Sequence, residues 1–93
     1  MPQFITIHRA PGLKREDFAA NAPEVFKGAY ATFLQSYVNL GAGFIASIYE
    51  AKSRDALEEE FERVGFPFDE IQEIQFSQSR AQLEGMLKQM GKI

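Results

Sequence analysis

The 93-residue sequence contains no cysteine, which excludes disulfide bonds, thiolate metal sites and a cysteine nucleophile. Its one histidine, His8, leaves little imidazole for metal binding or proton transfer. No apolar run approaches the ~20 residues that span a bilayer. The first residues lack a basic segment followed by an apolar one. We therefore expect a soluble, cytoplasmic protein without a signal peptide.

The sequence has fewer basic than acidic side chains. Ten Lys and Arg side chains face thirteen Asp and Glu, so the formal net charge is −3. This balance argues against nucleic acid or an anionic membrane as the main partner. A composition of 45% hydrophobic and 25% charged residues is typical of globular proteins. Because a chain this short has room for one hydrophobic core, we predict a single domain over residues 1–93.

The first third of the chain predicts a strand followed by helical structure. Residues 4–7 form a β-branched and aromatic run that ends near a Pro-Gly turn. Over residues 14–33 the apolar side chains recur at helical spacing. Pro23 interrupts this pattern because it lacks an N–H. The pattern therefore predicts a kinked helix, or two shorter helices with Asn21 as the N-cap of the second.

The middle of the chain predicts a β-hairpin. Residues 34–40 and 43–51 form its strands, joined across a glycine-containing loop. If the loop holds three residues, alternation sorts the side chains onto two faces. We expect the face toward the helices to carry Leu34, Val38, Phe44, Ala46 and Ile48. We expect the opposite face to carry Gln35, Tyr37, Asn39, Ile45, Ser47 and Tyr49. If Ile5 and Ile7 also face the helices, this second face gains Phe4, Thr6 and His8.

The last third predicts helix, strand and helix. Ser53 is a favourable N-cap, and Gly65 suits the left-handed position that ends a helix. The buried stripe of this helix is expected to be Leu57, Phe61 and Val64, and its solvated side Glu58, Glu59, Glu60 and Glu62. Residues 71–76 predict the fourth strand. Ser79 and Gln82 predict a capping box for an appended C-terminal helix over residues 79–91.

The predicted order is β-α-β-β-α-β, which is an α+β, ferredoxin-like sandwich with an extra C-terminal helix. Two helices would pack on one face of an antiparallel sheet. The other face carries aromatic and β-branched side chains, which are seldom left bare. We therefore expect a homodimer of the dimeric α+β barrel type, with two sheets packed face to face.

Several short strings resemble a family of small bacterial ferredoxin-like domains of uncharacterised function that includes a nickel-binding protein. They are Ser36-Tyr37-Val38, Ile48-Tyr49-Glu50-Ala51, and Gly65-Phe66-Pro67 with Ile71 and Ile74 behind it. The resemblance covers residues 1–76 and implies binding of a transition metal such as nickel. Members of this family tend to carry a histidine near the start of the second strand or in the second helix. Here Gln35 precedes the Ser-Tyr-Val string and the second helix has no histidine, so nickel ligands do not carry over residue by residue.

His8 is the one candidate nitrogen ligand for nickel or another divalent metal. Within one chain its partners would be the carboxylates of Glu50, Asp69 or Glu73. A dimer offers a second His8. The competing interpretation is a half-exposed histidine at a strand end, bonded to backbone or water.

The leading hypothesis from the sequence is a small homodimeric protein that binds a small molecule or a metal ion. An alternative is a cofactor-free oxygenase, isomerase or decarboxylase with His8, Tyr37 and Tyr49 as catalytic residues, since dimeric α+β barrels host such enzymes. The two tyrosines are otherwise cross-strand packing or dimer contacts. A second alternative is a structural or interaction module without a ligand.

Overall fold

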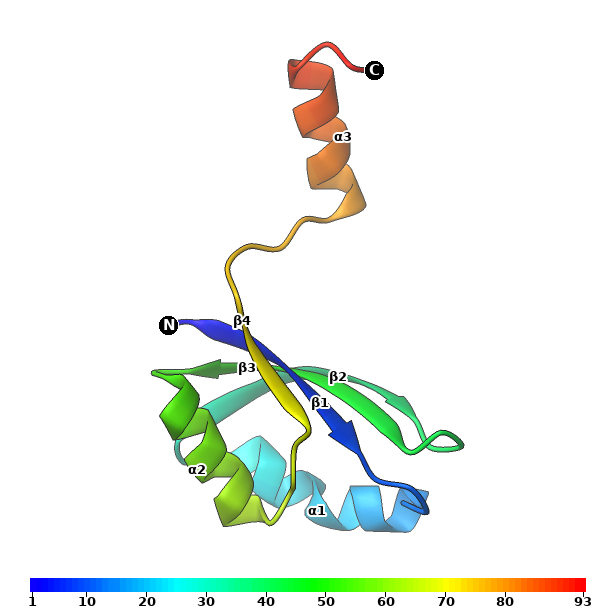
Figure 1. The fold of residues 1–93 in the computed structure, drawn as a ribbon, viewed down its shortest axis with the longest axis vertical. Helices are drawn as coiled ribbons and strands as arrows, with labels where there is room; N and C mark the ends of the chain where they lie inside the picture. Colours follow the sequence, from blue (N-terminus) through cyan, green and yellow to red (C-terminus); the bar gives the residue numbers. More distant parts are fainter.

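The computed structural model describes residues 1–93 and contains one four-stranded sheet and three helices (Figure 1). The strands are β1 (Gln3–Arg9), β2 (Ala31–Asn39), β3 (Phe44–Ala51) and β4 (Glu70–Ile74), and the helices are α1 (Arg15–Lys27), α2 (Arg54–Val64) and α3 (Arg80–Gln89). The strand order is β2-β3-β1-β4, and every neighbouring pair is antiparallel. This is the ferredoxin-like α+β arrangement, so the predicted fold class is confirmed.

The hydrophobic core lies between the sheet and the helices that cover one of its faces. In Figure 1, α1 and α2 lie on the same side of the sheet, while α3 stands apart beyond the end of β4. The core cluster consists of Phe4, Ala31, Tyr49, Ala51, Leu57, Phe61 and Ile71. No helix is long and apolar enough to cross a membrane.

The predicted assignment of β1 and β3 side chains to the two faces is wrong. Ile45, Ser47 and Tyr49 are buried beneath the helices, and so are Phe4, Thr6 and His8. The side chains of Ile5, Ile7, Phe44, Ala46 and Ile48 lie on the other face, which we call the open face. Strand β3 carries apolar side chains on both faces, so alternation could not decide which of its faces is buried. Strand β1 buries the polar Thr6 and His8 and leaves Ile5 and Ile7 on the open face, which is the reverse of what alternation suggests.

The hairpin differs from the prediction at its loop and in β2. The loop spans residues 40–43, and the register between β2 and β3 shifts between Phe33 and Gln35. The extra residue at this bulge is Leu34, which is 44% exposed. The prediction that Leu34 packs under the helices is therefore wrong. Beyond the bulge, Tyr37 lies opposite Ala46 on the open face, where it was predicted.

Helix α1 is one continuous helix that contains Pro23, and Asn21 lies inside it instead of capping a second helix. The predicted helical region is also too long. The helix ends at Gly28, whose φ of 59° suits glycine, and β2 begins three residues later. Phe33 therefore belongs to a strand, although its spacing from the earlier apolar residues is also helical.

The predicted caps of the other helices are confirmed. Ser53 Oγ accepts a hydrogen bond from Ala56 N–H at 3.1 Å, and Gly65 ends α2 in the left-handed conformation. In α3, Ser79 Oγ accepts from Gln82 N–H at 3.1 Å, and Gln82 Oε1 accepts from Ser79 N–H at 2.7 Å. The fourth strand is shorter than predicted and ends at Ile74.

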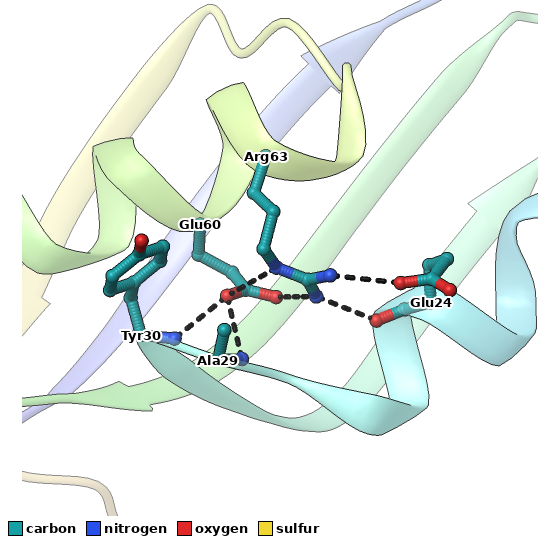
Figure 2. Close-up of polar contacts among 5 residues, drawn as sticks. All are labelled: Glu24, Ala29, Tyr30, Glu60 and Arg63. Atoms are coloured by element: carbon teal, nitrogen blue, oxygen red, sulfur yellow. Dashed lines mark hydrogen bonds and ion pairs between the residues drawn. The ribbon is translucent and has the colours of Figure 1, made fainter.

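Glu60 was predicted on the solvated side of α2 but is 1% exposed. Figure 2 shows the hydrogen bonds and the ion pair that satisfy this carboxylate. Its Oε1 accepts hydrogen bonds from Ala29 N–H at 3.0 Å and Tyr30 N–H at 2.9 Å, and its Oε2 lies 2.7 Å from Arg63 Nη2. Arg63 in turn donates to the carboxylate of Glu24 at 2.9 Å and to its carbonyl at 2.8 Å. We call these five residues the Glu60 clamp; they join α2 to the end of α1 and the start of β2.

The hydrogen bonds of the clamp keep Glu60 ionised. Burial raises the pKa of Glu60, but the bonds from Arg63 and from the two backbone N–H groups outweigh this and hold the pKa below 4.5. The bonds to Glu60 and Glu24 raise the pKa of Arg63. A charged pair with its remaining lone pairs satisfied is the condition under which a buried ion pair is tolerated.

We predict that Glu60→Gln lowers the free energy of unfolding at pH 7 by about 2 kcal/mol, because the amide loses the charged hydrogen bonds to Arg63. The matched control is Glu59→Gln, an exposed neighbour on α2 whose substitution should cost less than about 0.5 kcal/mol. Urea unfolding followed by circular dichroism measures both. Equal effects of the two substitutions would contradict the role of the clamp.

The lowered pKa of Glu60 also predicts that the effect of Glu60→Gln depends on pH. The unfolded carboxyl binds its proton near pH 4.5, before the folded one does, so the contribution of Glu60 is complete above pH 4.5. It disappears as the pH falls through the lower pKa of the folded state. The stability difference between wild type and Glu60→Gln should therefore shrink as unfolding is measured at pH values progressively below 4.5. A difference that grows in acid would contradict this.

Candidate functional site

A cavity of about 460 Å³, which we call the α1 cavity, lies between α1, β2 and the C-terminal end of α2. Of its 14 lining residues, nine are hydrophobic. Phe18, Ala22 and Val25 line it from α1, and Phe33 lines it from β2. A mostly apolar cavity of this volume is within the range of small-molecule sites.

The cavity exists because α1 covers the sheet without filling the space beneath it. None of the residues of α1 is buried. The Glu60 clamp holds the C-terminal end of the helix. Its N-terminal end follows the turn after β1, which is itself fixed to the β2–β3 loop by a hydrogen bond of 2.7 Å from Ala10 N–H to Gly43 C=O. Between these ends, the side of α1 that lines the cavity carries Phe18, Asn21, Ala22 and Val25, and these side chains leave the space open.

Few polar side chains reach the α1 cavity. Asn21 of α1 and Ser36 of β2 line it. Arg9 also lines it, but its guanidinium carbon lies 5.7 Å from the ring centroid of Phe44, on the open face of the sheet. The cavity therefore offers hydrogen bonds from an amide and a hydroxyl, and suits a ligand with an apolar body and a small polar group.

His8 lies behind one wall of this cavity and is fully buried. Its ring stacks on Phe66 at a centroid distance of 4.1 Å and meets Phe61 edge-on at 4.9 Å. Nδ1 lies 2.9 Å from the carbonyl oxygen of Pro67, and Nε2 lies 2.8 Å from Thr6 Oγ1. Because a carbonyl only accepts, Nδ1 carries the proton, and the Thr6 hydroxyl donates to Nε2.

The surroundings of His8 favour the neutral ring. Burial lowers the pKa of His8 below 6.5, and this effect exceeds the opposing ones of the Pro67 carbonyl and the Asp69 charge. With both ring nitrogens bonded and the ring between aromatic side chains, His8 is part of the core. The half-exposed strand-end histidine expected from the sequence is therefore wrong.

The structure does not gather His8, Tyr37 and Tyr49 around one pocket. His8 and Tyr49 share a face of the sheet, as predicted, but this is the face that the helices cover. Tyr49 packs edge-on against Phe61 at 5.1 Å, and burial, together with the charge of Glu60, raises its pKa to about 12. Tyr37 is 58% exposed on the open face.

The donor set for a metal ion is also incomplete. No three His, Asp or Glu side chains gather at one place. The lone pair of His8 Nε2 is taken by the Thr6 hydroxyl, and Asp69 accepts a hydrogen bond from Arg9 N–H at 2.7 Å. Because His8 is buried, two copies of the chain could not bring their imidazoles together without opening the core. These residues do not fit a nickel ion.

Sequence reasoning missed the α1 cavity. The one local signal was Ala22, a small residue on the side of α1 that faces β2. Gly65-Phe66-Pro67, one of the strings that carry the family resemblance, also lines the cavity, and Phe66 stacks on His8 as well.

Both the sequence and the fold of the chain match known proteins. A family model described as "Nickel responsive protein SCO4226-like" matches residues 4–74. Among solved structures, the crystal structure of SCO4226 from Streptomyces coelicolor A3(2) is similar, with a TM-score of 0.70 and 26% sequence identity. The match covers 82% of this chain and 99% of that chain. No curated protein matches the sequence.

We predict that His8 titrates with a pKa below 6.5 and that its neutral ring carries the proton on Nδ1. As the chain has one histidine, its ring signals in a ¹⁵N-edited NMR titration are unambiguous. As the pH falls, His8 therefore binds its proton near pH 6.5 in the unfolded chain and only at a lower pH in the folded chain. The contribution of His8 to the free energy of unfolding should be constant above pH 6.5 and should fall as the pH drops toward the pKa of the folded state. A pKa above 6.5, or a proton on Nε2, would contradict the assignment.

Proposed function

The chain belongs to the SCO4226-like family of nickel responsive proteins, and we propose that this member binds a small apolar molecule in the α1 cavity instead of a metal ion at His8. The observation that carries the proposal is the cavity of about 460 Å³ with nine hydrophobic residues among its 14 lining residues. Ligand binding, the leading hypothesis from the sequence, is kept, but its location moves from the sheet face to the space beneath α1.

The chemistry of the cavity defines the class of ligand. Aromatic walls from Phe18, Phe33 and Phe66 favour a flat or branched apolar body. Asn21 and Ser36 supply a donor and acceptors for one hydrogen-bonding group. A ligand with several charges would leave them unpaired in the cavity, and such burial is costly. The ligand is therefore an apolar molecule with a single polar end.

The family description supports metal binding only in general, and this chain's own donors argue against it at His8. A nickel ion prefers imidazole nitrogen, and the one imidazole here has both nitrogens bonded to Thr6 and Pro67. The enzyme alternative has no better support, because Tyr37 lies on the face of the sheet opposite to His8 and Tyr49. A structural module without a ligand is the outcome if the cavity binds nothing.

We predict that a hydrophobic fluorescent probe, anilinonaphthalene sulfonate, binds the folded protein and that Ala22→Trp weakens its binding about tenfold, or 1.4 kcal/mol, by filling the cavity. The matched control is Ala20→Trp, an exposed position of α1 that does not line the cavity and should bind like wild type. Fluorescence titration measures the dissociation constants.

A third variant separates the cavity from the open sheet face, which is also apolar. Ile48→Glu changes the open face and leaves the cavity lining intact. It should leave probe binding unchanged. If Ile48→Glu abolishes binding and Ala22→Trp does not, the ligand site is on the open face and the proposal is wrong.

We further predict that Ni²⁺ leaves the ring signals of His8 unchanged. Paramagnetic Ni²⁺ broadens the NMR signals of any group that it binds, and His8 has no free lone pair in the folded protein. The measurement is an NMR titration of labelled protein with Ni²⁺ at neutral pH. Selective broadening of the His8 ring at low Ni²⁺ would show that the imidazole is a ligand after all.

A further inference from the structure

Helix α3 extends away from the rest of the molecule (Figure 1). None of its residues is buried. The Cα radius of gyration is 15.9 Å, compared with about 12 Å for a compact chain of this length. The helix therefore has no packing partner within its own chain.

The sequence of α3 nevertheless calls for a partner. Leu83, Met86, Leu87 and Met90 form one apolar stripe along the helix. A helix of ten residues is only marginally stable in water by itself, even with a good cap. Phe76, in the connection before the helix, is 80% exposed. Both the helix and its connection carry apolar surface that must be covered for the helix to persist.

The open face of the sheet is the second uncovered apolar surface. Ile5 and Ile7 of β1 lie beside Ile48 and Ala46 of β3 in register, and Tyr37 of β2 lies beside Ala46. Helices α1 and α2 cover only the other face. An apolar stripe that crosses the three strands β2, β3 and β1 is a suitable surface for one apolar side of a helix.

Charge complements the apolar match. Residues 80–93 carry three basic side chains, Arg80, Lys88 and Lys92, and one acidic side chain, Glu84. The other 79 residues carry seven basic and twelve acidic side chains. On the open face, Glu50 and Glu70 border the apolar stripe at the ends of β3 and β4. The C-terminal segment is therefore positive and the body that carries the open face is negative.

We propose that the open face of each sheet binds α3 of a second copy of the chain, in a reciprocal exchange. Each copy has one uncovered helix and one uncovered face, so a two-fold dimer covers both and leaves no surface for further copies. The connection supports exchange, because α3 continues outward from the edge strand β4 instead of turning back over the sheet. The family match ends at residue 74, so this interaction is a property of the present chain beyond the family domain.

The first test changes α3 alone in the full-length protein. Leu87→Glu places a charge in the apolar stripe and should weaken dimerisation by at least roughly thirtyfold. The matched control is Ala81→Glu, which adds the same charge on the opposite side of α3 and should leave the dimer intact. Sedimentation velocity over a concentration series measures both. A monomeric wild type, or a Leu87→Glu protein that dimerises like wild type, would overturn the proposal.

The second test identifies the occupant of the open face and uses the absence of native cysteine. Ile48→Cys protein and ¹⁵N-labelled Leu87→Cys protein are mixed and treated with a short flexible bis-maleimide. The proposal expects a covalent pair that contains one chain of each kind, identified by mass. Replacing Ile48→Cys by Ala20→Cys, on α1, should abolish this product.

Two other outcomes would overturn the exchange. A product made only from two Ile48→Cys chains would show that the sheets pair face to face without α3. A protein with both substitutions in one chain that cross-links only within itself would show that α3 folds back onto its own sheet. Neither result bears on the α1 cavity, which lies on the other side of the sheet.

Discussion

One buried carboxylate holds the helical layer of this protein together. Glu60 of α2 accepts hydrogen bonds from two consecutive backbone N–H groups in the connection between α1 and β2 and pairs with Arg63, which also holds Glu24. Helix α1 has no buried side chain with which to hold itself to the sheet. Its position over β2, and with it the width of the α1 cavity, therefore depends on a polar connection at its end more than on packing along its length.

The features that the sequence predicted well are those determined by local chemistry. Ser53, Gly65 and Ser79 act within one turn of their own position, so their roles as caps follow from residue type and spacing. The order of strands and helices is equally local. The faces of the sheet are not, because β3 is apolar on both sides, β1 buries Thr6 and His8 while its isoleucines lie on the open face, and the bulge at Leu34 cannot be recognised from composition.

The burial of Glu60 and His8 could not be predicted from local sequence either. Glu60 lies in a run of three glutamates that look alike in the sequence, and what separates it from its neighbours is a partner about thirty residues away. His8 was expected at an exposed strand end, but Phe66 and Pro67 cover it from a segment almost sixty residues later. Such long-range contacts satisfy buried polar groups, and no local pattern announces them. The result bears directly on function, because a histidine used in this way is unavailable as a ligand, whatever the family's fold allows.

The loose attachment of α1 has a consequence for how a molecule would reach the space beneath it. Segments with little buried apolar area open locally at a low free energy, well below that of global unfolding. Helix α1 is anchored at its two ends and has an exposed proline near its centre, where one backbone hydrogen bond is missing. We therefore expect α1 to open at a lower free energy than the sheet and α2. Because α1 forms one wall of the cavity, local opening of this helix would widen the space beneath it without unfolding the rest of the molecule.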